Sequence, residues 1–277
     1  MKIVKSVWRV ICYPLLYVGL QFLLFFICSV VIGARVAMDA ASQGGAAATP
    51  EDIMNAMSQL NTTLLLLFSN AATIALMALF MRKEWREESF LKPPAKELAA
   101  PILLCAAVGV SFSLLSDGAV YFSKLSELFP GYQGIITKIL GKSFITEIVV
   151  VGLLAPICEE FVFRGAVLGR LRKYSVKLPL ALIIQALLFA LVHMNIVQGA
   201  ATFVLGVLLG VLVVWSKTIW APIVTHITYN SISVIMVHAL GDTDIPDGVF
   251  AGITIAALAV TVVIIAALRR KLDVSKA

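Results

Sequence analysis

Residues 155–165, APICEEFVFRG, place Glu159, Glu160 and Arg164 inside an apolar run that extends over about 144–164. An apolar run of about 20 residues is long enough to cross the hydrocarbon core of a bilayer as a helix. Charged side chains at that depth are costly unless they face the interior of a helix bundle or a water-filled cavity. The stretch therefore predicts a membrane helix whose polar side faces other helices rather than lipid.

The whole chain has the composition of a membrane protein. Of its 277 residues, 60% are hydrophobic and 14% are charged, and the mean hydropathy is +0.98. Soluble domains have about 45–50% apolar and about 25% charged residues, so soluble globular, coiled-coil and disordered proteins are excluded. The four cysteines lie in apolar runs without a Cys-x-x-Cys pair, which indicates neither a disulfide framework nor a thiolate zinc site.

Eight stretches are apolar and long enough to span a bilayer. They lie at about 10–34, 62–81, 98–116, 144–164, 178–198, 199–216, 218–240 and 248–268. We therefore predict an all-α, polytopic membrane protein in which about eight transmembrane helices form one bundle. Residues 1–277 are expected to form a single membrane domain.

The polar stretches between these segments predict turns and loops. Residues 198–200 and 217–218 are expected to form tight turns. Residues 35–61 contain glycines, alanines and a proline, which predicts a flexible loop. Residues 119–140 predict an interfacial helix that is broken at Pro130 and Gly131.

The formal net charge of +6 is distributed unevenly along the chain. Of the 22 Lys and Arg residues, 17 precede the first segment or follow the second, fourth, sixth and eighth segments. An excess of basic residues is typical of cytoplasmic loops. We therefore expect an integral membrane protein with both termini and the 82–97 loop in the cytoplasm. The positive charge is attributed to this orientation, and nucleic acid is not an expected partner.

Charged residues and histidines occur in only three of the eight segments, 144–164, 178–198 and 218–240. The set comprises Glu147, Glu159, Glu160, Arg164, His193, His226 and His238. Ionisable residues at membrane depth usually face the bundle interior and have a function there. We therefore predict a polar cavity between these three helices, with His238, near the end of its segment, as a packing residue.

The spacing in 155–165 assigns partners to the two glutamates. Successive residues of a helix point about 100° apart, so we expect Glu159 and Glu160 to face different partners. Glu160 and Arg164 are four residues apart and can form an ion pair, which favours the charged form of a buried carboxylate. Negative charge is therefore expected to persist in this apolar surrounding.

The other two helices each carry a pair of candidate residues. His193 follows Phe189 by four residues, and Asn230 follows His226 by four. Residues at this spacing share one helix face. From the rise of about 1.5 Å per residue, Glu159, both histidines and Asn230 are expected near the middle of the bilayer. The sequence predicts that they converge on one cavity.

These three motifs together resemble those of a known family. Glu-Glu-x-x-x-Arg at 159–164, Phe-x-x-x-His at 189–193 and His-x-x-x-Asn at 226–230 are similar to the motif set of the CPBP family. This family comprises intramembrane endopeptidases, among them CAAX-processing proteases and bacterial bacteriocin-processing and immunity (Abi-like) proteins. The resemblance covers 144–240, the expected catalytic core. It implies an endopeptidase of a bacterial cell membrane that acts on a membrane-associated peptide or protein, with Glu159 as general base.

The residue types suit hydrolysis of a peptide bond. This reaction needs a general base that activates water and donors that stabilise the oxyanion of the tetrahedral intermediate. Glu159 and His193 are expected to hold and deprotonate the water. His226 and Asn230 are expected to donate to the oxyanion.

Three further residues are expected to support this group: Glu160, Arg164 and Phe189. Glu160 and Arg164 would orient the Glu159 carboxylate and tune its charge. The alternative is a zinc mechanism, in which Glu159, His193 and His226 are the ligands and a water takes the fourth position. We favour the mechanism without a metal or other cofactor.

Two other functions remain open from the residues alone. A polytopic transporter could use the buried Glu and His residues to couple protons or ions. A catalytically silent immunity or scaffold protein would also contain such helices. The lipid bilayer is an expected partner in every case, and the oligomeric state is not predicted.

Overall fold

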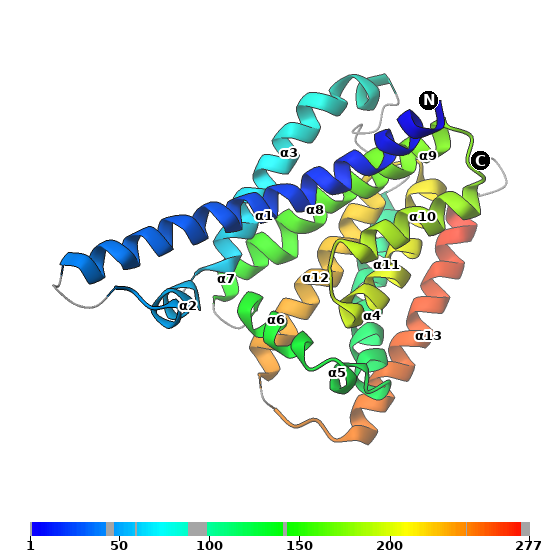
Figure 1. Cartoon of the computed structure of the whole chain (residues 1–277). Helices are drawn as coiled ribbons and strands as arrows, with labels where there is room; N and C mark the ends of the chain where they lie inside the picture. The colour runs from blue at the N-terminus through cyan, green and yellow to red at the C-terminus, as the bar shows by residue number, and fades with distance from the viewer. Residues whose placement is uncertain are drawn as a thin grey trace.

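A computed structural model describes residues 2–42, 47–58, 60–87, 99–140, 143–241 and 243–272. Every regular element in these ranges is a helix (Figure 1). The elements are α1 (Lys2–Ser42), α2 (Pro50–Ser58), α3 (Thr62–Glu87), α4 (Ala99–Phe122), α5 (Leu125–Leu128), α6 (Gly131–Ile139), α7 (Phe144–Glu147), η2 (Ile148–Leu154), α8 (Ala155–Glu160), η3 (Phe161–Leu168), α9 (Gly169–Lys173), α10 (Leu178–Leu191), α11 (Ile196–Ser216), α12 (Trp220–Leu240) and α13 (Asp247–Lys271).

Among the described helices, six are long and apolar enough to cross a membrane: α1, α3, α4, α11, α12 and α13. The other two predicted segments are also helical. α7, η2, α8, η3 and α9 follow one another without a break over 144–173, and we call this stretch the central rod. α10 is a shorter apolar helix of 14 residues. The prediction of an all-α polytopic membrane protein is therefore confirmed, with eight as an approximate count.

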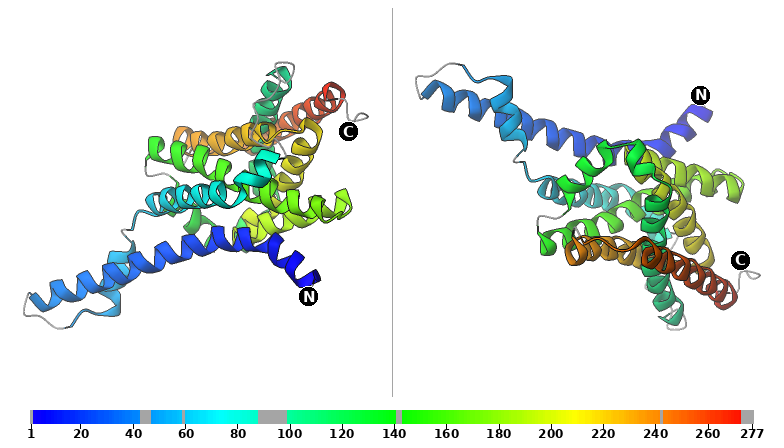
Figure 2. Two further views of the ribbon diagram at one scale, coloured as in Figure 1. Left: turned by 90° about the horizontal axis from the view of Figure 1, so that it is seen from above. Right: turned by 90° about the horizontal axis from the view of Figure 1, so that it is seen from below.

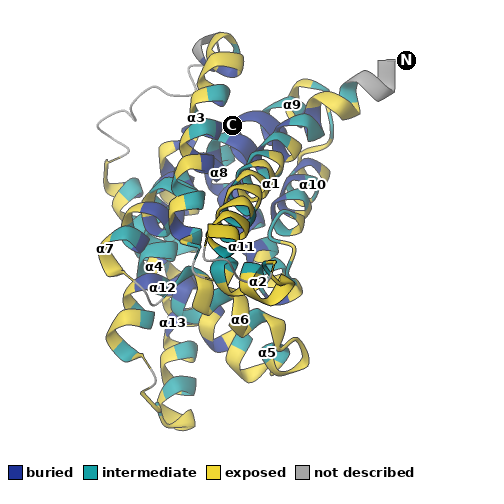
Figure 3. Ribbon diagram, turned by 60° about the vertical axis from the view of Figure 1, so that its left-hand side comes forward, coloured by how far each residue is buried: buried dark blue, intermediate teal, exposed yellow. Residues whose placement is uncertain are grey.

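The central rod lies in the middle of the bundle. It packs against α1, α3, α10 and α12, while α4 packs against α12 and α13. All seven residues of 162–168 are buried (Figure 3). A helix that is buried on all sides is surrounded by protein rather than by lipid. This position explains how the rod can hold two glutamates and an arginine at membrane depth.

One predicted turn lies at a different place. α10 ends at Leu191 and α11 begins at Ile196, so the chain turns at 192–195 rather than at 198–200. The Asn195 side chain accepts hydrogen bonds from Val197 N and Gln198 N at 3.0 and 3.1 Å and so caps α11. Met194 adopts a left-handed conformation with φ of 49°. The predicted turn at 217–218 is confirmed, since Lys217, with φ of 53°, ends α11.

The two polar stretches also differ from the prediction. Residues 35–61 are not a continuous loop, because α1 extends to Ser42 and α2 occupies Pro50–Ser58; 43–46 and 59 lie outside the described residues. Thr49 and Asp52 cap α2 reciprocally, with Thr49 Oγ1 2.7 Å from Asp52 Oδ2. In 119–140 the expected break at Pro130 is confirmed, since it separates α5 from α6. Most of the 82–97 loop lies outside the described residues.

α1 is packed on the bundle along its first half only. It contacts α3 and η3 through the buried residues Val10, Tyr13 and Tyr17. No residue of 18–42 is buried, and this half, which has α2 beside it, diverges from the rest of the bundle (Figure 2). The N-terminal end of α1 and the C-terminal end of α13 lie at the same end of the bundle (Figure 1).

Candidate active site

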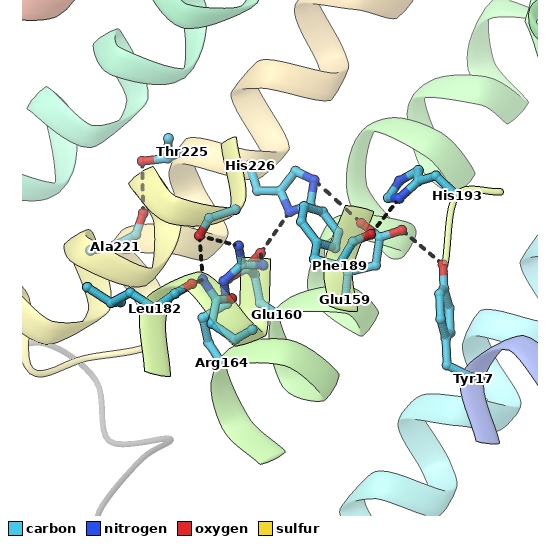
Figure 4. A network of polar contacts seen from close by, with 12 residues as sticks. Tyr17, Glu159, Glu160, Arg164, Leu182, Phe189, His193, Ala221, Thr225 and His226 are labelled. Carbon is cyan, nitrogen blue, oxygen red and sulfur yellow. Dashed lines mark hydrogen bonds and ion pairs between the residues drawn. The ribbon is translucent and has the colours of Figure 1, made fainter. Parts of the chain in front are cut away.

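Two adjacent glutamates lie at the end of α8, where the central rod changes from α-helical to π-helical winding. Glu159 is 6% exposed and Glu160 is fully buried. π-Helical turns occur frequently at functional sites. Figure 4 shows side chains from α1, α10 and α12 around this point of the rod.

Glu160 accepts two hydrogen bonds on one oxygen. Its Oε1 lies 2.7 Å from Arg164 Nη1 and 2.8 Å from His226 Nδ1. An ionised carboxylate only accepts, so the Nδ1 of His226 is the donor. Glu160 therefore fixes the orientation of the imidazole ring as well as pairing with the arginine predicted from the spacing.

Arg164 is held on its other side by α10 and α11. Its Nη2 donates to the Gly206 carbonyl at 3.0 Å, and Gln185 Nε2 donates to the same carbonyl at 2.7 Å. A Cβ at Gly206 would lie 3.0 Å from Ala186, so glycine permits the close approach of the two helices here. The guanidinium also lies 4.8 Å from the centre of the Phe189 ring.

Glu159 has a different pair of neighbours. Its Oε1 accepts a hydrogen bond from the Tyr17 hydroxyl at 2.9 Å, and its Oε2 lies 3.5 Å from His226 Nε2. The expectation that the two glutamates face different partners is therefore wrong in one respect, because both contact His226. The imidazole carries its nitrogens on different edges of the ring, so a ring placed between the two carboxylates meets both.

This arrangement also changes the expected action of Glu160 and Arg164. Both were expected to orient Glu159, whereas the structure connects Arg164 to Glu160 and Glu160 to His226. The route from Arg164 to Glu159 therefore passes through the His226 ring (Figure 4). The result is a linear series of contacts from Gln185 and Gly206 to Tyr17.

His193 lies in the turn after α10 and not on the helix itself. Its Nδ1 is 2.8 Å from the Phe189 carbonyl, which only accepts, so Nδ1 carries the proton. In the neutral ring, Nε2 is then an acceptor. The fully buried Phe189 ring packs edge-on against His193, at 5.1 Å, and against His226, at 5.7 Å. Figure 4 shows the His193 ring beside the Glu159 carboxylate.

Asn230 lies one turn beyond His226 on α12. Its Nδ2 donates to the Val151 carbonyl in the central rod at 2.9 Å. An amide nitrogen carries two hydrogens, so this bond engages only one of them. The structure thus fixes Asn230 against η2, next to the turn of α12 that carries His226.

The last histidine belongs to a separate pair. His238 Nε2 lies 2.8 Å from Glu147 Oε2, and Glu147 Oε1 accepts a hydrogen bond from Ser143 N at 2.9 Å. Glu147 is buried at the start of the central rod. This pair joins the end of α12 to the rod, which agrees with the expected packing role of His238.

The alternative zinc set is not assembled in this geometry. Within the part of the chain that the structure describes, no three His, Cys, Asp or Glu side chains are grouped as a metal site requires. His226 directs one nitrogen to Glu160 and the other toward Glu159.

Two residues of this network were not predicted from the sequence. Tyr17 is a tyrosine among apolar residues of the first segment, and Gln185 is one of three Asn or Gln residues in the fifth. A polar side chain in an apolar helix is a signal that a partner exists. This signal does not show which residue of another helix is the partner.

Comparison with known proteins agrees with the three motifs. The family model for type II CAAX prenyl endopeptidases, Rce1-like, matches residues 141–232, which include Glu159, His193, His226 and Asn230. The membrane-embedded CAAX protease MroQ of Staphylococcus aureus (strain USA300) is 26% identical over 180 residues, covering 62% of this chain and 71% of the relative. Over this region the chain is similar to the CPBP family of CAAX proteases. No solved structure matches it significantly. The resemblance found from the motifs is thus confirmed, and it supports an intramembrane endopeptidase.

Proposed function

We propose that this protein hydrolyses a peptide bond in a membrane-associated peptide or protein with a water molecule activated by Glu159. The observation that supports this most is the buried series of Glu159, His226 and Glu160, with the imidazole between two carboxylates. Buried ionisable groups that are positioned this specifically are typical of catalytic sites.

In the first step, a water molecule lies between Glu159 and His193 Nε2. Glu159 takes a proton from this water while the water oxygen attacks the carbonyl carbon of the substrate. A C–O bond forms, and the carbonyl oxygen becomes an oxyanion. His193 contributes an acceptor that orients the water, because its own proton is on Nδ1 and faces the Phe189 carbonyl.

The oxyanion is stabilised by donors on α12. His226 Nε2 and the second hydrogen of Asn230 Nδ2 supply these hydrogen bonds, and in this role the imidazole carries a proton on each nitrogen. The intermediate then collapses, the C–N bond breaks, and the proton held by Glu159 passes to the leaving nitrogen. The products are a carboxylate and an amine.

The experiment compares membrane peptides and proteins from cells that carry the wild-type chain or Glu159→Ala. We expect a polypeptide that is cleaved only with the wild type, and we expect His193→Ala to resemble Glu159→Ala. The matched control is His238→Ala, which removes a histidine from the separate pair with Glu147 and retains cleavage. Equal cleavage by the wild type and Glu159→Ala would refute the proposed function.

A second experiment tests the substrate class. The matching family model is named for CAAX prenyl endopeptidases, so the purified protein is assayed on peptides with and without a prenylated cysteine.

Exhaustive chelation and elemental analysis test whether the mechanism needs a metal. A glutamate base retains its activity after chelation, whereas one zinc per chain that is lost and restored together with activity would make Glu159, His193 and His226 metal ligands.

A further inference from the structure

We infer that Tyr17 is a positioning residue for Glu159: its hydroxyl holds the carboxylate in the orientation in which the second oxygen faces His226. The inference rests on the proposed function of Glu159 as a base. It concerns a residue on α1, outside the segment 141–232 that the family model matches.

The contact between the two side chains is buried and directional. The Tyr17 hydroxyl lies 2.9 Å from Glu159 Oε1, and the two residues are 5% and 6% exposed. The carboxylate only accepts, so the phenol donates. This bond occupies Oε1 and leaves Oε2 facing His226 Nε2 at 3.5 Å. Rotation of a glutamate carboxylate about its last torsion is soft, so a fixed donor is needed to select one orientation.

The tyrosine ring is itself held in place. It packs edge-on against Phe163 of the central rod, with ring centres 6.5 Å apart and an interplanar angle of 88°. Phe163 is itself fully buried. The tyrosine ring is therefore restrained by its contact with the rod.

A second set of contacts, on the N-terminal side of Tyr17, fixes α1 against the rod. Arg170 Nη1 donates to the Arg9 carbonyl at 3.2 Å, and its Nη2 donates to the Tyr13 hydroxyl at 3.1 Å. The same Nη2 lies 3.1 Å from Glu84 Oε1 on α3. Arg9, Tyr13 and Tyr17 are each four residues apart and so lie on one face of α1. Arg170 and Glu159 both belong to the rod, and they attach to this one face.

The position of α1 therefore determines where the hydroxyl lies. Tyr17 is the last buried residue of the helix, and no residue of 18–42 is buried. The hydrogen bond to Glu159 thus depends on the anchor that Arg170 provides on the N-terminal side. Arg170 acts on Glu159 through α1.

The test uses the purified full chain and an internally quenched peptide that spans the bond whose cleavage requires Glu159. Tyr17→Phe keeps the ring and removes only the hydroxyl. We expect kcat to fall about 10- to 100-fold, the equivalent of one hydrogen bond to a charged group, while KM stays within about twofold. Tyr229→Phe is the matched control, since its hydroxyl donates to Ser116 within the same bundle, and it retains the wild-type kcat.

A double-mutant cycle tests the route from Arg170. Arg170→Gln is expected to lower kcat about tenfold in the wild-type background and to have little further effect in the Tyr17→Phe background, since residues that act through one contact are not additive. This variant also tests the inference if Tyr17→Phe does not fold. Additive losses, or a kcat for Tyr17→Phe within about twofold of the wild type, would overturn the inference. Activity of Glu159→Ala would instead refute the proposed function, so the two failures are distinguishable.

Discussion

Arg164→Met tests whether the buried ion pair holds the site together. The substitution removes the charge and keeps a long, flexible side chain. The Arg164 and Glu160 side chains are both 0% exposed, with Nη1 and Oε1 2.7 Å apart. Removing one partner of a buried pair costs about 3–5 kcal/mol, because the other charge stays buried without compensation. The Gly206 carbonyl still accepts from Gln185, so Glu160 accounts for most of the loss.

This cost is measurable as a thermal shift. At about 2–4 °C per kcal/mol, the Tm of Arg164→Met falls by about 6–20 °C. The double variant Arg164→Met with Glu160→Gln removes both charges. We expect its Tm to return close to that of the wild type, because replacing a whole buried pair with neutral residues is often neutral for stability.

We expect the double variant to regain stability without regaining cleavage. The Gln amide makes only a neutral hydrogen bond with His226 Nδ1, which is roughly half as strong as a charge-assisted one. We expect kcat of the double variant to remain about 10- to 100-fold below the wild type. The assays are thermal unfolding in detergent micelles and cleavage of the internally quenched peptide. A wild-type Tm for Arg164→Met, or a wild-type kcat for the double variant, would refute the role of Glu160 in orienting His226.

Three further predictions concern other parts of the chain. Asn230→Ala lowers kcat on the same peptide by about 10²–10³, as expected for one oxyanion donor, whereas Glu159→Ala leaves no cleavage; equal losses would contradict the assigned roles. His238→Ala lowers the Tm by about 2–12 °C through loss of the bond to Glu147, and an accompanying loss of kcat would contradict its structural role. In a chain whose cysteines are replaced by serine, an impermeant thiol reagent labels Asp244→Cys in intact cells and Lys173→Cys only after lysis. The reverse pattern would overturn the prediction that both termini are cytoplasmic.

The arrangement of helices was predictable because apolar length dominates their formation in a membrane. Each of the eight predicted segments contains a helix, including 144–164, which the central rod contains, although a turn at 192–195 interrupts 178–198. Helix ends were less predictable, because hydropathy measures lipid compatibility and not helix propensity. The stretch after Ala34 is less apolar yet contains good helix formers, so α1 continues to Ser42. Asn195 caps α11 before Gly199, and a glycine alone does not end a membrane helix.

One contact of the candidate site was predictable from the sequence, and the contacts between helices were not. Arg164 and Glu160 were paired correctly because four residues separate them on one helix. The contact between Tyr17 and Glu159 joins residues 142 positions apart and depends on how α1 is rotated against the rod. The π-helical turns on either side of α8 further change which way each rod residue points. A helical period of 3.6 residues does not contain this information.

From the length of α1 we expect the thickness of the surrounding bilayer to affect turnover. The helix has 41 residues, and its apolar stretch 10–34 measures about 38 Å, longer than the hydrocarbon thickness of about 30 Å. Such hydrophobic mismatch is accommodated by tilt, and all the buried residues of α1 lie in its first half. Because no residue of 18–42 is buried, we expect a thinner or thicker bilayer to tilt this part of α1 and to move the Tyr17 hydroxyl relative to Glu159. We expect turnover in vesicles of short-chain and long-chain phosphatidylcholine to differ for the wild type and to converge for Tyr17→Phe.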